Sequence, residues 1–146
     1  MPRIRLLLLA ALAGALSLFA TAPTAGAETV RLHAVMTPSQ ETPPTASPGI
    51  GDATVLFPGG NTVCVVLRVT RTTGPVTGAH IHQAPAGVPG PVVIPLTPPR
   101  NGFSFTCRTV ATGLINELRS NPSAFYANVH TPTYPLGELR GQLAAA

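Results

Sequence analysis

Apolar and polar residues alternate along most of the chain from residue 30 onward, and this period of two predicts β-strands. The alternation is longest over residues 61–70, where four apolar residues share one face, so we expect this strand to lie inside a sheet. Further strands are predicted over residues 30–36, 50–57, 78–82, 91–96, 102–108, 124–130 and 138–143. The 14 glycines and 17 prolines stand mostly between these segments, where they mark turns.

One short helix is predicted over residues 112–120. Leu114, Ile115 and Leu118 form a single apolar stripe at helical spacing. Thr112 is placed to cap the N-terminus, and the Asn121-Pro122 pair ends the segment. Seven or eight short strands with one short helix predict an all-β fold, either an antiparallel Greek-key β-sandwich or a flattened barrel.

The first 27 residues have the pattern of a secretory signal peptide. Arg3 and Arg5 precede an unbroken apolar run, which ends in a small-residue cleavage site at residues 25–27. Residues 28–146 are then expected to form one domain outside the cytoplasm. No later segment is apolar and long enough to predict a membrane span.

The charge of the chain argues against nucleic-acid binding. Arg3 and Arg5 would leave with the signal peptide, so the formal charge of +4 would become +2. The remaining arginines are scattered singly along the chain. A nucleic-acid surface needs them clustered.

Cys64 and Cys107 are the only cysteines. An even count in an exported chain predicts one disulfide. Neither cysteine lies in a metal-binding spacing, so the pair is interpreted as structural. In the strand 102–108 the cysteine shares its face with two phenylalanines, opposite three polar residues: Phe103, Phe105 and Cys107 against Ser104, Thr106 and Arg108.

The histidines are the candidate chemistry. His80 and His82 stand two residues apart on a strand, so both project from one face, and His130 on another strand is able to complete a three-nitrogen set. Imidazole ligands without thiolates suit copper and other transition metals rather than a structural zinc knot. On this hypothesis Arg140 and Asn128 lie beside the site as supporting groups, with Arg140 as a supporting group or a guide for an anion.

His33, also on the polar face of its strand, is a possible fourth ligand. Copper binding would weaken below roughly pH 6, where an ordinary imidazole protonates. Structural hydrogen bonding to the loop of residues 84–91 is the competing interpretation, with Asn128 and Arg140 as further anchors of that loop. An acid–base role in catalysis is a third alternative.

Little else in the sequence predicts an enzyme. The acidic residues are spread singly, and no nucleophile, metalloprotease or phosphate-loop motif occurs. Glu138 and Arg140 share a strand face two residues apart, which predicts a solvated or loop-anchoring ion pair.

Several short motifs, taken in order, resemble the CHRD domain of chordin and of secreted bacterial proteins. They are the Glu41-Thr42-Pro43-Pro44 element, the Ala79-His80-Ile81-His82 element with its glycine-proline loop, the Asn121-Pro122 pair, the Asn128-Val129-His130-Thr131 element, and the closing run from Gly137 to Leu143. The resemblance covers about residues 30–143. It implies a secreted, non-enzymatic binding or structural module of the cell exterior, whose extracellular partner is unknown.

A looser resemblance is to the copper/zinc superoxide dismutases, which also carry a His-x-His pair, a later valine-histidine element and an arginine near the C-terminus. His80, His82, His130 and Arg140 follow that order. No histidine lies between His82 and His130, so the bridging ligand and zinc loop of those enzymes have no counterpart. The alternative function is therefore a copper-binding protein of the envelope, with dismutase-like chemistry ranked below it.

Overall fold

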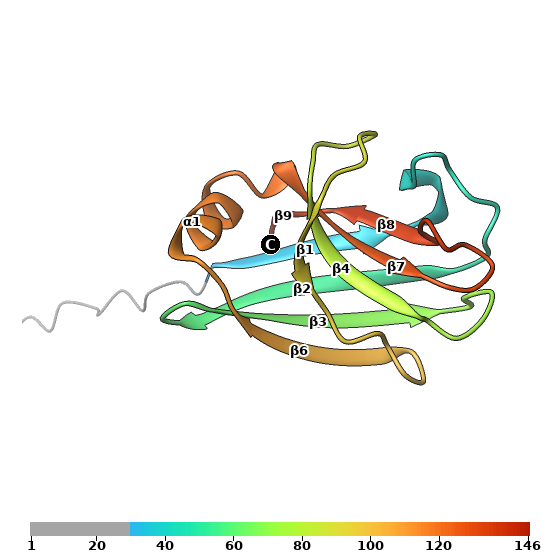
Figure 1. Ribbon diagram of the computed structural model, residues 1–146, viewed down its shortest axis with the longest axis horizontal. Coiled ribbons are helices and arrows are strands. Elements are labelled where there is room, and N and C mark those ends of the chain that lie inside the picture. The colour runs from blue at the N-terminus through green and yellow to red at the C-terminus, as the bar shows by residue number, and fades with distance from the viewer. Residues whose placement is uncertain (1–29) are drawn as a thin grey trace, which may run out of the picture.

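Two antiparallel sheets pack face to face in the computed structural model, which describes residues 30–146 (Figure 1). The predicted signal peptide, residues 1–27, lies outside the described residues. The strands are β1 (Arg31–Met36), β2 (Ile50–Gly59), β3 (Thr62–Thr70), β4 (Gly78–Gln83), β5 (Val92–Pro95), β6 (Phe103–Thr109), β7 (Phe125–His130), β8 (Leu139–Gln142) and β9 (Ala144–Ala145). Two 3₁₀ turns, η1 (Pro38–Gln40) and η2 (Pro122–Ala124), and one helix, α1 (Thr112–Ser120), complete the fold.

The five-stranded sheet has the order β6-β3-β2-β1-β9, and the four-stranded sheet has the order β5-β4-β7-β8. The first three strands form a meander, and the chain then crosses to the other sheet for β4 and β5. It returns with β6 beside β3, and passes through α1 to place β7 beside β4. This arrangement confirms the predicted all-β sandwich, and neither sheet closes into a barrel.

The core lies between the sheets and consists of the inward-facing apolar residues that the alternation predicted. Strand β3 is paired on both sides, as its length and pattern indicated. The most deeply buried apolar side chains include Leu32, Met36, Val55, Leu67, Ile81, Phe125, Val129 and Leu139.

Helix α1 lies at one end of the sandwich, close to the β2–β3 turn (Figure 1). Ile115 and Leu118 are buried, as the apolar stripe predicted. The predicted cap is wrong, because Ala111 occupies the N-cap position and the Thr112 hydroxyl donates to Asn61 Oδ1 instead, at 2.9 Å. Asn121 ends the helix, as expected.

A disulfide joins Cys64 on β3 to Cys107 on β6, and it fixes which way β6 faces. Cys64 alternates with Val63 and Val65, which point into the core, so both cysteines lie on the outer face. The period of two then places Phe105 outward as well. Phe103 and Phe105 are 52% and 55% exposed, while Ser104 and Thr106 are buried.

The polar face of the four-stranded sheet is also buried. Strand β7 is buried on both faces up to its last residue. The connections 37–49, 84–91 and 131–138 all make hydrogen bonds to the polar side chains of β4, β7 and β8. Sequence alternation marked this face as polar, and the loop-anchoring interpretation placed residues 84–91 against it, but the sequence gave no sign that the 37–49 and 131–138 connections cover it as well.

The orientation of β6 predicts that Leu67→Ala and Phe105→Ala lower the free energy of unfolding by different amounts. Leu67→Ala should lower the free energy of unfolding by about 2–5 kcal/mol, because it opens a cavity in the core. Phe105→Ala should cost less than about 1 kcal/mol, because the ring is half in solvent. Urea unfolding of both variants with the disulfide intact measures the difference. Equal costs would mean that Phe105 packs in the core.

Candidate functional site

The three histidines singled out from the sequence lie together on the polar face of the four-stranded sheet. His80 and His82 project from β4, and His130 ends the neighbouring strand β7. In the antiparallel register Gly78 pairs with His130. A glycine at that position leaves the space beside the His130 ring open, since an added Cβ would lie 3.2 Å from the ring.

The ring nitrogens are close enough to share one ion. Each histidine offers one nitrogen, and these nitrogens lie within 4.8 Å of one another. A point therefore exists within about 2.8 Å of all three, against metal–nitrogen bonds of about 2.0–2.1 Å. Two of the nitrogens, His80 Nδ1 and His130 Nε2, are 3.2 Å apart. Two nitrogens bound tetrahedrally to one metal would be about 3.3 Å apart.

Backbone carbonyls determine the tautomers of two of these rings. His82 Nδ1 lies 2.9 Å from the Gly90 carbonyl, and His130 Nδ1 lies 3.0 Å from the Pro135 carbonyl. A carbonyl oxygen only accepts, so both Nδ1 atoms carry the proton. In the neutral rings both Nε2 atoms then present a lone pair. The same carbonyl contact orients the ligating histidines of many metal sites.

His82 Nε2 is buried and has no hydrogen-bond partner among the described residues. Buried ring nitrogens are normally satisfied, because an unpaired polar atom away from water costs free energy. His130 Nε2 differs, because it accepts a hydrogen bond from Nδ1–H of His80. In the metal-free cluster the His80 Nδ1 proton lies between His80 and His130, and it would have to leave for both nitrogens to bind an ion, whereas the lone pair of His82 Nε2 is already unused.

All three imidazoles resist protonation. The pKa of His80 is lowered to about 4, chiefly by burial and then by the positive charges that His130 and His82 would carry. Burial also lowers the pKa of His82 and of His130, against the opposing effect of their carbonyl partners. The rings are consequently neutral near pH 7 and able to bind a cation.

Arg140 and Tyr126 support His82 from the side. The His82 and Tyr126 rings stack at 4.7 Å with an interplanar angle of 4°, and the Arg140 guanidinium lies 3.5 Å from the centre of the Tyr126 ring. Because β7 lies between β4 and β8, the imidazole and the guanidinium are on opposite sides of the tyrosine. The three groups form one stack across three strands.

The same arginine fastens the loop that holds His82. Arg140 donates to the Pro85 carbonyl at 2.8 Å and to the Val88 carbonyl at 3.0 Å. At the end of that loop, Gly90 donates its N–H to the Tyr126 hydroxyl at 3.1 Å, while its carbonyl accepts from His82. This confirms Arg140 as a loop anchor. At 2% exposure the side chain is too deeply buried to collect anions from solvent.

Glu138 is a second buried anchor, and its predicted ion pair with Arg140 is wrong. Its carboxylate accepts hydrogen bonds from Ser47 Oγ and Thr131 Oγ1, both at 2.6 Å, and from the N–H and hydroxyl of Thr73. Burial alone would raise the pKa of Glu138, but these hydrogen bonds outweigh it and hold the pKa below its usual value. Among residues 30–146 the one ion pair is Arg68 with Asp52.

Asn128 does not anchor the loop of residues 84–91, contrary to the sequence-based expectation. Its side-chain amide donates to Glu41 Oε1 at 2.6 Å and so holds the 37–49 connection. Burial raises the pKa of Glu41 to about 7, although Arg140, the Thr42 N–H and Asn128 act against the shift. The sequence marked Glu41 only as a motif position. Its contact with a residue 87 positions away could not be read from local spacing.

His33 is not a fourth ligand. It lies on β1 in the five-stranded sheet, paired with Thr54, and alternates with core residues Leu32 and Ala34. Its side chain therefore points outward on the opposite side of the sandwich from His80. The first strand has the predicted polarity, but belongs to the other sheet.

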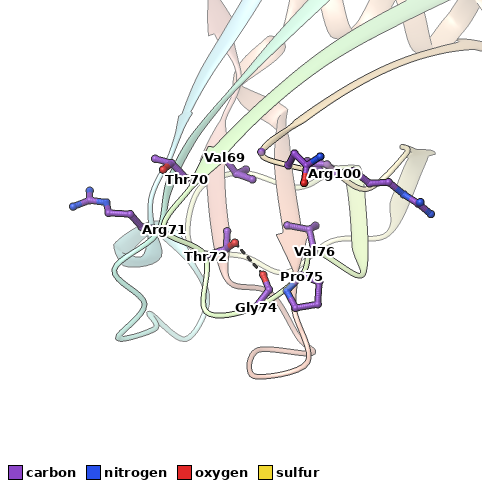
Figure 2. Close-up of a pocket in the computed structure, with 11 residues that line it drawn as sticks. Val69, Thr70, Arg71, Thr72, Gly74, Pro75, Val76 and Arg100 are labelled. Carbon is purple, nitrogen blue, oxygen red and sulfur yellow. Dashed lines mark hydrogen bonds between the residues drawn. The ribbon is translucent and has the colours of Figure 1, made fainter.

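A hollow of about 840 Å³ lies between the β3–β4 connection and the β5–β6 connection. Figure 2 shows Arg71 and Arg100 on opposite sides of it, both extending away from its centre. None of the clustered histidines lines this hollow. It adds no polar group to the candidate site.

Comparison with known families identifies the domain. The family model of the CHRD domain matches residues 32–143, and the chain belongs to the CHRD-domain family. The match extends from β1 to the residue after β8, so it includes all three clustered histidines. Comparisons with curated proteins and with solved structures give no match. The function therefore has to be argued from the site.

The Glu138 anchor generates a prediction for stability. Glu138→Gln should lower the free energy of unfolding by about 2–4 kcal/mol at pH 7, because the amide cannot accept four hydrogen bonds to a charge. A lowered folded-state pKa gives stability that is present above the ordinary value of 4.5 and lost as the pH falls through the folded value. The loss of unfolding free energy caused by Glu138→Gln should therefore be smaller at acid pH.

Urea unfolding at pH 7 and pH 3.5 measures this change. Glu117→Gln is the matched control, since Glu117 is exposed and accepts a hydrogen bond from the exposed Gln83. We expect the control to change stability by less than about 0.5 kcal/mol. A pH-independent deficit in Glu138→Gln would contradict a charged, hydrogen-bonded Glu138.

Proposed function

We propose that this CHRD-domain protein is an exported, non-enzymatic module that binds one transition-metal ion through His80, His82 and His130. The observation that carries the proposal is the buried, unpartnered Nε2 of His82 beside two other imidazoles. Its opposite ring nitrogen is held by a carbonyl, as in a metal-ligating histidine. Metal binding explains both the carbonyl contact at Nδ1 of His82 and the unpaired lone pair at its Nε2.

Loop anchoring is the competing function, and it accounts for part of the geometry. The Nδ1 contacts of His82 and His130 do hold the loops at Gly90 and Pro135. Anchoring alone gives no reason for three imidazoles to converge, since each loop needs only one. It also leaves the buried Nε2 of His82 without a role.

Copper is the metal that the donor set favours. The cluster contains three imidazoles and neither a carboxylate nor a thiolate. Imidazole suits copper, zinc and nickel, and divalent copper stands highest in the general order of affinity. Structural zinc sites usually have four protein ligands. We therefore expect copper to displace zinc from the site in competition.

Two features support export. Residues 1–27 have the pattern of a signal peptide, and the Cys64–Cys107 disulfide is typical of oxidising compartments. In the part of the chain that is described, no helix has the length and apolar character to cross a membrane. We place the protein outside the cytoplasm, where its metal or its protein partner would be met.

The proposal is tested by metal content. Wild-type protein purified from the secreted fraction and incubated with copper should retain about one ion per chain after gel filtration. His82→Ala should lose this binding, because the remaining two imidazoles hold the ion at least about tenfold more weakly. His33→Ala is the matched control and should retain it. Equal copper content in wild type and His82→Ala would leave the histidines as loop anchors.

The lowered pKa values set the pH at which copper is released. A proton competes with the metal only below the pKa of the ligand, and the pKa of His80 is about 4 rather than 6.5. The release expected from ordinary imidazoles, near pH 6, therefore moves downward. Copper should remain bound at pH 5.5 and be lost near pH 4. Equilibrium dialysis across this range measures it, and half-release above pH 6 would contradict the lowered pKa values.

A further inference from the structure

We infer that the three-histidine site holds copper as Cu(I) in preference to Cu(II). This inference rests on the proposed metal site and names the oxidation state that the site selects. It follows from three features of the described residues: the neutrality of the ligands, the buried charge of Arg140, and the restricted access to His82.

The ligands bring no negative charge to the ion. The three donors are neutral imidazoles, and within residues 30–146 no carboxylate or thiolate joins the cluster. The two buried acids on this side of the sheet are committed elsewhere. Glu138 accepts from Ser47, Thr73 and Thr131, while Glu41 accepts from Asn128. A divalent ion would therefore bind with both of its charges uncompensated by ligands.

Arg140 adds a positive charge to these surroundings. Its guanidinium carbon lies 3.5 Å from the centre of the Tyr126 ring, which lies 4.7 Å from the centre of the His82 ring. The guanidinium is thus no more than about 8 Å from the imidazole. No acid lies within 4.0 Å of Arg140 in the part of the chain described. An ion bound to His82 Nε2 would lie up to roughly 11 Å from the guanidinium. At an effective dielectric constant of about 20, the charge would lower the affinity for a divalent ion about tenfold more than the affinity for a monovalent one.

Restricted access to the site acts in the same direction. Cu(II) favours a square or tetragonal set of four or more ligands, so a three-histidine site would have to supply it with water. His82 Nε2 is buried, and the 84–91 loop is fastened over its strand by Arg140. Cu(I) is satisfied by three nitrogens. The protein therefore offers a coordination number that suits the reduced ion.

The test is a pair of competition titrations on the whole protein. Cu(I) affinity is measured anaerobically against bicinchoninate, and Cu(II) affinity is measured against nitrilotriacetate. Wild type should bind Cu(I) at least about tenfold more tightly than Cu(II). Arg140→Gln removes the charge and the loop contacts, while Arg140→Lys keeps a charge and loses the fork of donors. The Cu(I) preference should fall about tenfold in Arg140→Gln and be largely kept in Arg140→Lys.

Glu41→Gln provides a second variant that leaves Arg140 in place. Glu41 and Arg140 line the same hollow on this face, so the Glu41 carboxylate partly offsets the Arg140 charge at pH 8. Removing it should increase the preference for Cu(I), the opposite sign to Arg140→Gln. This variant keeps the inference testable even where Arg140→Gln does not fold.

The outcomes separate this inference from the proposed function. If neither ion binds in a histidine-dependent way, the metal site itself is wrong. If copper binds through the histidines but Cu(II) is held as tightly as Cu(I), the metal site stands and the inference is overturned. Equal changes in Arg140→Gln and Arg140→Lys, with no change in Glu41→Gln, would also overturn it, because Arg140 would then act through the loop alone.

Discussion

The burial of polar side chains on one face of the four-stranded sheet constrains the rest of the site. Asn128, Glu138 and Arg140 are at most 3% exposed, and burial favours hydrogen bonds for each of them, although Asn128 Oδ1 has no partner among the described residues. The three connections that cover the face supply most of those partners through carbonyls, hydroxyls and the Glu41 carboxylate. The loops and the polar strand face therefore fix each other.

These contacts between the loops and the strand face determine which ring nitrogens of the histidines are protonated. The carbonyls of Gly90 and Pro135 belong to covering loops, and they accept hydrogen bonds from the Nδ1–H groups of His82 and His130. The Nε2 atoms are consequently free of protons and turned toward the shared space. Arg140 and Tyr126 act one step further out, because they hold the loop that carries the Gly90 carbonyl. The loop-anchoring interpretation therefore concerns Nδ1 of these rings, and the metal-binding interpretation concerns Nε2 of the same rings.

Most of the fold could be predicted from the sequence, because strand alternation and turn residues are local signals. The sequence also placed His80 and His82 on one face, since side chains two residues apart on a strand must point the same way. It could not show that β7 lies beside β4, or that β1 belongs to the other sheet, because strand pairing is not a local property. The sequence could therefore only suggest that His130 joins the other two histidines. The strand register places it beside them, whereas His33 lies in the other sheet.

Other features of the structure differ in how far the sequence indicates them. The outward direction of Phe105 follows from the disulfide, because Cys64 opposes Val63 and Val65 and draws Cys107 to the outer face. That signal was present in the sequence. The partners of Glu138 were not, because Ser47, Thr73 and Thr131 come from three separate connections. Hydrogen bonds between side chains of distant loops produce no periodic pattern in the sequence.

The central claim is that the covering loops leave Nε2 of His82 and His130 unprotonated, so that His82 Nε2 is free to bind an ion and His130 Nε2 becomes free once its hydrogen bond from His80 is released. Imidazole nitrogen chemical shifts of the metal-free protein at pH 7, from long-range nitrogen–proton correlation spectra, measure it directly. The account predicts the Nδ1–H tautomer for both rings, with His82 Nε2 shifting when one equivalent of Cu(I) is added. A protonated Nε2 on either ring of the metal-free protein would contradict it.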